Sequence, residues 1–394
     1  MRRISALLLF AAAFPFPILA DTWLVVPFSN QTQKPALDWI GESIAESISE
    51  ALTREGLLVV NREARKEGEA RMALRANTPW TRASMLKLAS ALDADHLVFG
   101  NYEVIPAQDP AAIGTLKIAA ESINVRDFRR SGAFSESGPL EELASLQSHL
   151  SWQVLKNSVP KSAPGEEQFR LARTNIRVDA VENYVRGLLA SSPESQERLF
   201  QQALKLDTRY SQAAFQYGRL LLRKNNFPSA ALQLEKVQTW DPHYREANFL
   251  LGLAKFRQND FRAAEAAFQR VSREVPLSEV LNNLGIAQLR LGMPEALENL
   301  RRALEGDDKD PVYHFNLGVA LLLRGAFTEA ATQFRATLDR DPGDQDATKF
   351  LGRSLRPLAG TPAKEELFGS ERLKLDFQEA AYQQLKALIG PPKK

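Results

Sequence analysis

Five tetrapeptides in the second half of the chain end in glycine and recur at nearly constant spacing: FQYG at residues 215–218, FLLG at 249–252, NNLG at 282–285, FNLG at 315–318 and KFLG at 349–352. Successive glycines are separated by 34, 33, 33 and 34 residues. Alanine and proline keep the same period, twelve and twenty-four residues after a glycine, at Ala230, Ala264, Ala330, Pro242, Pro276 and Pro342. A period of this length predicts a stack of two-helix repeats.

Each recurring residue type has a mechanical reason in such a stack. Glycine and alanine let two helix backbones approach closely, because they carry no side chain or a small one. Proline cannot continue a helix and therefore ends the second helix of a repeat. Asn226 and Asp260 fall between the two predicted helices, where a short polar side chain accepts hydrogen bonds from free backbone amides. The pattern predicts an all-α solenoid in the second half of the chain.

Four segments resemble tetratricopeptide repeats, namely residues 211–244, 245–277, 278–310 and 311–344. The third segment is one residue short at its turn. A weaker repeat at residues 180–210 precedes them, and residues 345–356 supply one more first helix, so about five repeats cover residues 180–356. The resemblance implies a non-enzymatic binding protein whose first helices line a concave face that takes protein or peptide partners.

The same resemblance implies which side chains face the groove. Counted from the start of each repeat, positions 2, 5, 6, 9 and 12 point to the concave side. The candidate partner-binding residues come from positions 5, 6 and 9 and are Phe215, Arg219, Phe249, Leu253, Asn282, Asn283, Ile286, Phe315, Asn316, Val319, Lys349 and Arg353. Amide side chains can both donate to and accept from a peptide backbone. Two alternatives stay open: the asparagines could serve local hydrogen bonds, and the phenylalanines could pack in the core instead of forming an exposed apolar stripe.

The first half of the chain has a different pattern. Apolar runs at residues 23–28 and 57–60 flank a helical period at 37–54, which gives the order strand, helix, strand. Two more helical stretches, two further strands and a closing helix follow, at residues 64–74, 82–92, 96–105, 115–125 and 140–159. These elements predict an α/β domain with a small mixed sheet over residues 21–160, joined to the repeats by a linker at residues 161–179.

Short apolar strings in this domain carry a second resemblance. They are VPF at residues 26–28 with Asn30, WIGE at 39–42, VVNR at 59–62 and LDADHLVFG at 92–100. Over residues 22–155 the chain resembles the amino-terminal domain of TolB and the related FlgO-type envelope domains. This resemblance implies a non-catalytic binding module of the bacterial envelope. No β-propeller follows the domain, so a Tol-Pal role does not carry over.

The amino terminus predicts a compartment. Arg2 and Arg3 precede an apolar stretch at residues 4–14 and a breaker segment that ends at Ala20, which is the pattern of a cleavable secretory signal. Residues 1–20 are therefore predicted to be a signal peptide cleaved near Ala20, and the protein to be periplasmic or otherwise exported. Retention of this segment as an anchor is the alternative. The chain has no cysteine, hence no lipoprotein attachment site and no disulfide.

Composition and motifs exclude several function classes. The chain carries 50 basic and 48 acidic residues, and loss of Arg2 and Arg3 leaves a neutral protein, whereas a nucleic-acid binder shows a concentrated basic face. No other apolar run is long enough to cross a membrane. Phosphate loops, nucleophile elbows and paired histidines are missing from the sequence. We therefore predict no catalytic residue, no cofactor and no metal site.

After residue 356 the chain passes through Pro357, Gly360 and Pro362 into a helical pattern at residues 371–389. The end of a solenoid exposes an apolar face, so residues 357–394 are predicted to be a capping helix and a tail. The leading hypothesis is an exported scaffold or adaptor that binds partners through its groove. The alternative is an envelope sensor whose amino-terminal domain binds a small ligand while the repeats relay or oligomerise. The sequence leaves partner identity and oligomeric state open.

Overall fold

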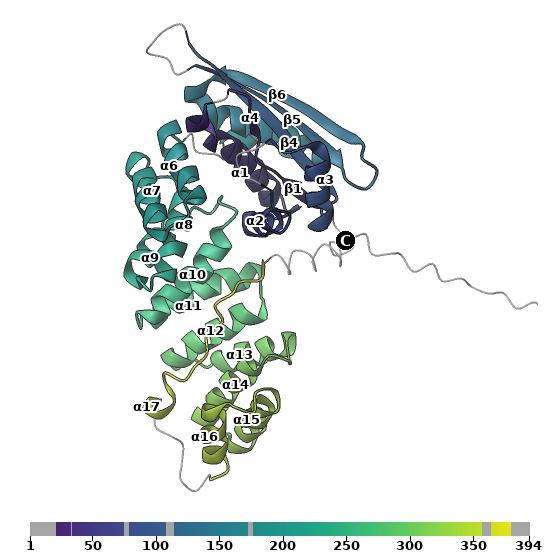
Figure 1. Cartoon of the computed structure of the whole chain (residues 1–394). Coiled ribbons are helices and arrows are strands. Elements are labelled where there is room, and N and C mark those ends of the chain that lie inside the picture. The colour runs from purple at the N-terminus through teal and green to yellow at the C-terminus, as the bar shows by residue number, and fades with distance from the viewer. Residues whose placement is uncertain are drawn as a thin grey trace, which may run out of the picture.

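The computed structural model describes residues 21–32, 34–74, 79–107, 114–171, 176–356 and 364–379. The predicted signal peptide at residues 1–20 and the end of the chain at 380–394 lie outside the described residues. An α/β domain sits beside one end of a long helical array, as Figure 1 shows. This architecture confirms the predicted fold class. Within the described ranges, no helix combines the length and apolar character that a membrane crossing needs.

The sheet of the amino-terminal domain is mixed. Its strands are β1 (Thr22–Val25), β2 (Ser29–Asn30), β3 (Leu58–Val59), β4 (His96–Ile105), β5 (Thr115–Asn124) and β6 (Arg130–Pro139). The order is β3-β1-β4-β5-β6, with β2 paired to β4. Strand β1 runs parallel to β3 and β4, and β2 runs parallel to β4, whereas β5 is antiparallel to both β4 and β6.

Helices cover both faces of the sheet around β1. On one face, α1 (Trp39–Arg54) and α4 (Leu143–Ser158) pack over Trp23 and Val25. On the other face, α3 (Arg82–Ala91) packs over Leu24 and Val26, and α2 (Arg62–Arg71) lies next to it. Because β1 is buried on both sides, its sequence reads as a continuous apolar run instead of an alternating one. Two short 3-10 turns, η1 (Pro35–Leu37) and η2 (Leu140–Glu142), precede α1 and α4.

Strand β6 and part of the linker were not predicted. Strand β6 is rich in serine and glycine and alternates between exposed and half-buried residues, so it pairs with β5 without burying an apolar face. The predicted linker at residues 161–179 contains a helix, α5 (Glu166–Leu171). Phe169 is buried in the main core, and the Trp152 indole donates a hydrogen bond to the carbonyl of Pro164 at 3.1 Å. The junction is therefore packed, since it carries an aromatic anchor that its polar composition conceals.

The repeats begin at α6 and pair their helices as the glycine period predicts. The helices are α6 (Val178–Leu189), α7 (Pro193–Leu206), α8 (Ser211–Arg223), α9 (Phe227–Leu234), α10 (Tyr244–Arg257), α11 (Phe261–Glu274), α12 (Ser278–Leu291), α13 (Ala296–Gly306), α14 (Pro311–Leu323), α15 (Phe327–Arg340) and α16 (Gln345–Ser354). A Cβ built on Gly252 would lie 2.5 Å from the ring of Phe268, and one on Gly318 would lie 2.8 Å from Phe334. These glycines are thus required by the close approach of the second helix.

The turns inside the repeats also follow the prediction. Asn226 accepts a hydrogen bond from the amide of Ser229 at 3.3 Å, and Asp260 accepts one from Ala263 at 3.1 Å, so both residues cap their second helices. In the short third repeat, Gly292 takes a left-handed conformation, with φ of 71°, directly after α12. Glycine adopts this conformation without steric cost, which allows the tighter turn.

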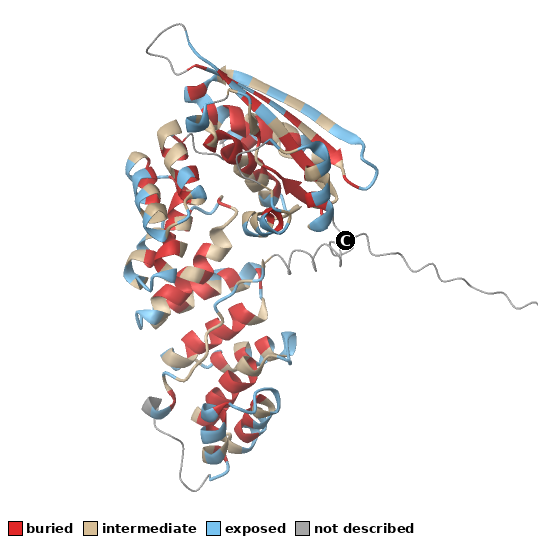
Figure 2. Cartoon of the chain, in the orientation of Figure 1, coloured by how far each residue is buried: buried red, intermediate tan, exposed pale blue. Residues whose placement is uncertain are grey.

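The first repeat docks on the α/β domain. Helix α1 packs against α6, and buried residues of both belong to one continuous core, which Figure 2 shows as red positions on the two sides of the contact. Polar contacts surround it: Arg186 donates to the carbonyl of Ala36 at 2.8 Å, and Gln212 donates to Glu50 at 2.9 Å. The shared core holds the domain and the array together as one body.

Candidate functional site

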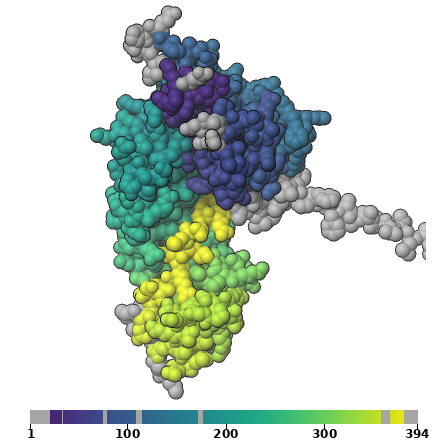
Figure 3. All heavy atoms as spheres, in the orientation of Figure 1, coloured from purple at the N-terminus to yellow at the C-terminus, as the bar shows by residue number. Residues whose placement is uncertain are grey.

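A short stretch of the chain's own carboxyl-terminal region crosses the concave side of the array. After α17 (Lys364–Leu367), residues 371–378 run as extended chain, and Glu379 is the first helical residue. We call residues 371–379 the tail segment. In Figure 3 the yellow end of the described chain lies along the surface of the green repeats and reaches toward the amino-terminal domain. The groove that the sequence assigned to a partner therefore already contains a peptide.

The predicted capping helix at residues 371–389 is thus wrong for residues 371–378, and the remainder from residue 380 lies outside the described residues. The reason is that the backbone of the tail segment makes its hydrogen bonds with groove side chains instead of with itself. The apolar period that suggested a helix includes Leu373 and Phe377. Both of these side chains pack on the array while the backbone stays extended.

Three asparagines bind the backbone of the tail segment. Asn316 donates to the carbonyl of Arg372 at 2.8 Å and accepts from its amide at 3.0 Å. Asn283 makes the same pair of bonds with Lys374, both at 2.8 Å, and Asn282 adds a bond of 3.1 Å to the Arg372 carbonyl. Residues 372 and 374 present their backbone to the same side because an extended chain repeats every two residues. Further along, Glu279 accepts from the amide of Gln378 at 2.9 Å.

The asparagines also bind one another. Asn316 donates to Asn282 at 2.8 Å, and Asn282 donates to Asn283 at 3.1 Å. All three are at most 1% exposed. The local hydrogen bonds and the peptide contact, which the sequence presented as alternatives, therefore occur together. The local bonds fix the orientation of each amide, so that its oxygen and nitrogen face a peptide group.

Charged side chains of the tail segment pair with groove residues of opposite sign. Arg372 forms two bonds with Asp344, of 2.5 and 2.8 Å, and its guanidinium lies 3.5 Å above the ring of Phe315. The bonds from Arg372 lower the pKa of the Asp344 carboxyl. Lys374 binds Asp310 at 2.5 Å. Glu371, which is almost fully buried, binds Arg290 at 3.1 Å.

The other end of the tail segment is aromatic and acidic. The ring of Phe377 stacks on Phe249, with 5.2 Å between centroids. Glu379 binds Arg245 at 2.5 Å. The Glu371–Arg290 and Glu379–Arg245 contacts thus place one ion pair at each end of the segment. The groove thus contacts both the backbone and the side chains of a nine-residue extended peptide.

Some of the twelve predicted groove residues contact the tail segment, and the others lie elsewhere. Five of them contact the tail segment directly, namely Phe249, Asn282, Asn283, Phe315 and Asn316. Leu253 is buried in the apolar cluster that Leu373 and Phe377 join, whereas Ile286 and Val319 are buried in the adjoining core. Lys349 and Arg353 lie on α16, where Lys349 covers the ring of Phe350.

The remaining two candidates, Phe215 and Arg219, lie toward the amino-terminal domain. Phe215 stacks on His243 at 4.4 Å, and Arg219 binds Glu63 of α2 at 3.4 Å. Phe215, Phe249 and Phe315 are all 0% exposed, and for Phe249 and Phe315 the tail segment is part of what covers the ring. Phe215 is covered by His243 instead.

Several residues that contact the tail segment were not among the candidates, namely Arg245, Glu279, Arg290, Asp310, Tyr313 and Asp344. Glu279 stands at position 2, which the repeat pattern already places on the concave side. Asp310 and Asp344 precede first helices, and each also caps its helix by accepting a backbone amide bond at 2.9 Å. An acidic cap at the start of a first helix is the signal in the sequence that could have identified these two residues.

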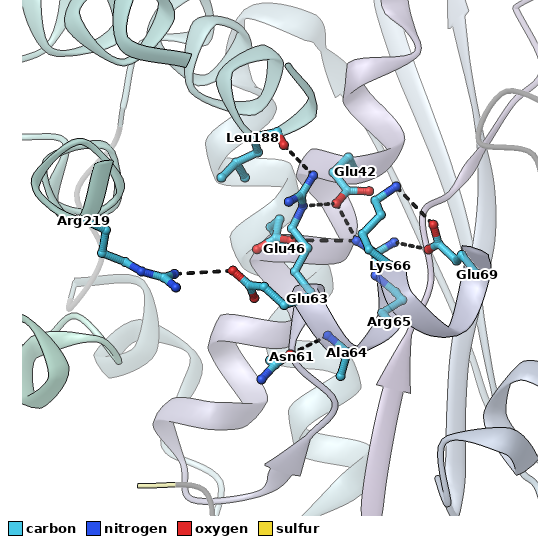
Figure 4. A network of polar contacts seen from close by, with 11 residues as sticks. Glu42, Glu46, Asn61, Glu63, Ala64, Arg65, Lys66, Glu69, Leu188 and Arg219 are labelled. Carbon is cyan, nitrogen blue, oxygen red and sulfur yellow. Dashed lines mark hydrogen bonds and ion pairs between the residues drawn. The ribbon is translucent and has the colours of Figure 1, made fainter. Parts of the chain in front are cut away.

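A second polar cluster connects the α/β domain to the first repeats, as Figure 4 shows. Glu42 of α1 binds Arg65 of α2 and receives a bond of 2.8 Å from Arg62, which also donates to the carbonyl of Leu188 at 2.6 Å. Burial disfavours a charged Glu42, but the two guanidinium groups outweigh it and lower its pKa to about 2. Burial, reinforced by the Glu42 carboxylate, raises the pKa of Glu46 to about 7.

A cavity of about 280 Å³ adjoins this cluster. It lies beyond the carboxyl end of β1 and is lined by residues that follow this strand, such as Phe28 and Asn30, and by Asp38, Glu42, Lys66, Glu69 and Trp80 among others. The chain leaves β1 toward β3 on one side and returns to β4 on the other, which makes this a position where open α/β sheets bind ligands. Among the described residues, no group of three or more acidic or histidine side chains could hold a metal ion.

Comparison with known proteins supports the repeat assignment. Residues 249–293 and 293–345 match the model of the tetratricopeptide repeat family, so the chain carries tetratricopeptide repeats. This match includes all three asparagines that hold the tail segment. A search among curated proteins found no match.

Two solved structures are similar to part of this chain at low sequence identity. One is YrrB, described as a tetratricopeptide repeat protein with an unusual peptide-binding site, at 23% identity over 48% of this chain and 90% of that chain, with a TM-score of 0.35. Another is MamA from Desulfovibrio magneticus RS-1, at 19% identity over 41% of this chain and 92% of that chain, with a TM-score of 0.37.

Proposed function

We propose that this protein is an exported, non-enzymatic scaffold that captures extended segments of partner proteins in the concave groove of its repeats. The observation that carries the proposal is the way Asn283 and Asn316 each hold one peptide group by its N–H and C=O together. An amide side chain placed in this way is complementary to the backbone of any extended chain. The tail segment supports the proposal, because it is an extended chain that these asparagines bond.

The proposed mode of binding separates affinity from choice of partner. Peptide groups are common to all partners, so the asparagines supply contacts that do not depend on sequence. Selection falls to the side-chain contacts, because a wrong charge opposite Asp310, Asp344 or Arg290 leaves a partly buried ion without its partner. The groove therefore suits internal segments of folded or unfolded partners. It shows no requirement for a free carboxyl terminus, since the chain continues beyond residue 379.

Export and the role of the first domain are part of the proposal. The pattern of residues 1–20 and the resemblance to TolB-type amino-terminal domains support a location in the bacterial envelope. In that setting the α/β domain would present the array, because its core is continuous with the first repeats.

The experiment that tests this function is photo-crosslinking in the living cell. Phe256 is half-buried at the groove, with the Arg290 guanidinium 6.0 Å above its ring, and a photoreactive phenylalanine analogue preserves its shape. We expect a discrete adduct whose partner protein is identified by mass spectrometry. The same analogue at Leu232, an exposed position on α9, is the control. Equal adducts from both positions would contradict the proposal, as would the absence of an adduct at position 256 in an exported and folded protein whose tail segment carries Arg372→Glu and Lys374→Glu.

A ligand sensor is the second candidate, and the cavity beyond β1 favours it. A cavity of about 280 Å³ with carboxylates, a lysine and Trp80 on its walls could hold a small polar molecule. In that case a ligand would raise the melting temperature of the full chain, because it binds only the folded state. Substitution of Trp80 by alanine would abolish the shift. A screen of envelope metabolites that gives no shift with the wild-type chain would leave the scaffold as the better account.

A further inference from the structure

We propose that the tail segment is a built-in competitor for the groove, and that its side-chain pattern defines the partner. The partner is an extended peptide with an acidic residue, a basic residue next to it, a second basic residue two positions later, an aromatic residue three positions after that, and an acidic residue at the end. This inference rests on the proposed function, because it specifies the ligand of the same groove and how access to it is controlled.

The groove residues that bind the charged side chains of the tail segment come from different repeats. Asp344 and Asp310 precede the first helices of successive repeats, so their spacing places two carboxylates along the groove for Arg372 and Lys374. The ring of Phe315 lies beneath the guanidinium of Arg372, a geometry that favours arginine over lysine at this position. Lys374 meets only one carboxylate and the ring of Tyr313, which a compact ammonium satisfies.

The flanking contacts fix the direction and register of the peptide. Arg290, which also stacks on the rings of Phe261 and Phe368, receives the first acidic side chain. Arg245 receives the last one, and Phe249 receives the aromatic ring between them. A shift by one residue would place Leu373 opposite one of the two carboxylates and move Arg372 and Lys374 away from both. A partner must therefore reproduce the order of charges and not only the composition.

Covalent attachment makes the tail segment a strong competitor. A ligand joined to its own site by a short connection experiences a high effective concentration, commonly in the millimolar range. A free peptide of the same sequence therefore competes poorly with the attached copy. Partners gain access only if they match the pattern and exceed the tail segment in affinity, or if the tail segment is released.

The test uses the full chain in two forms, wild type and a double variant with Arg372→Glu and Lys374→Glu, which opposes carboxylates in the groove with carboxylates in the tail segment. The probe is a fluorescent synthetic peptide with the sequence of residues 369–380, GSERLKLDFQEA. We expect fluorescence anisotropy to show at least tenfold tighter binding to the double variant than to the wild type. A peptide in which the same two basic residues are glutamate should bind neither chain.

A second pair of changes tests the groove side while preserving the helix caps. Asp310→Asn and Asp344→Asn retain side chains that cap helices well but remove the negative charges. Added to the double variant, they should weaken peptide binding at least tenfold with little change in melting temperature. If the double variant binds the peptide no better than the wild type, or binds the charge-reversed peptide equally well, the inference is wrong.

Failure of this inference can be told apart from failure of the proposed function. Tight peptide binding by the double variant, together with no cellular adduct at position 256 from either chain, would support the built-in competitor and contradict the scaffold. Equal adducts from the wild type and the double variant, without a gain in peptide binding, would support the scaffold and contradict the competitor.

Discussion

Replacement of Asn316 by leucine should release the tail segment while leaving the array folded. Leucine has a similar volume but can neither donate nor accept a hydrogen bond. The change removes the two bonds between Asn316 and the backbone of Arg372, of 2.8 and 3.0 Å. It also removes the N–H group of Asn316 that donates a hydrogen bond to the Asn282 oxygen at 2.8 Å.

The size of the effect follows from these three bonds. Each hydrogen bond between the asparagine and the backbone of the tail segment contributes about 0.5–1.5 kcal/mol net, and a buried acceptor left without a donor costs about 1–3 kcal/mol. The Arg372 carbonyl keeps its bond from Asn282, which limits the loss. A total of about 2–4 kcal/mol would shift the balance between docked and undocked tail segment by roughly 30-fold to several hundred-fold.

Hydrogen–deuterium exchange measures this balance. In the wild type, the amides of Arg372, Lys374 and Gln378 are protected because they donate to groove side chains. In the Asn316→Leu variant, peptides covering residues 371–379 should exchange faster by a similar factor, while those of α10 and α12 keep their protection. Asn299→Leu is the matched control, because Asn299 bonds Gln288 at 2.8 Å on the neighbouring helix. Unchanged exchange of the tail segment, or equal loosening of the whole array, would show that Asn316 does not hold the tail segment in the groove.

Three further predictions concern stability and the peptide. Phe377→Ala should remove the stack on Phe249 and weaken docking of the tail segment by about 1–2 kcal/mol, which tighter binding of the 369–380 peptide to the variant chain would reveal. Gly252→Ala should lower the free energy of unfolding by about 1–3 kcal/mol in urea titrations, because its Cβ would lie 2.5 Å from Phe268; a gain would show that the second helix yields easily. The pKa of Glu46 is raised to about 7 from an ordinary 4.5, so ionisation of this carboxyl destabilises the folded state. This destabilisation is absent below pH 4.5 and complete above pH 7. Glu46→Gln should therefore add about 3 kcal/mol to the free energy of unfolding at pH 8.5 and less than about 1 kcal/mol at pH 5, and equal gains at both pH values would contradict the raised pKa.

The sequence predicts the repeats well because their determinants are local and periodic. Gly252 and Gly318 are required wherever a second helix packs closely, and Asn226 and Asp260 cap helices through residues three positions away. The resemblance to tetratricopeptide repeats implies which positions face the concave side. Asn282, Asn283 and Asn316 stand at such positions and bond the tail segment, a ligand that the sequence analysis did not foresee.

The tail segment and β6 escape prediction because distant contacts decide their conformation. The tail segment has an apolar spacing typical of a helix, yet Asn316 and Asn283, which lie 56 and 91 residues from their bonded partners, satisfy its backbone in extended form. Strand β6 has few apolar residues and exists through its ladder with β5. In both cases the partner of the backbone, and not the segment's own pattern, selects the structure.

If the tail segment and the partner occupy the same groove, a reversible covalent link between the tail segment and the groove should block the partner. The chain lacks cysteine, so Arg245→Cys and Glu379→Cys provide the only thiols, at a contact where the native side chains bond at 2.5 Å. A short cleavable bismaleimide joins the two thiols across the space that the Arg245 and Glu379 side chains occupy, and so holds the tail segment in the groove. The linked protein should capture neither the 369–380 peptide nor the cellular partner, and cleavage of the linker should restore both. Equal capture before and after cleavage would show that partners bind elsewhere.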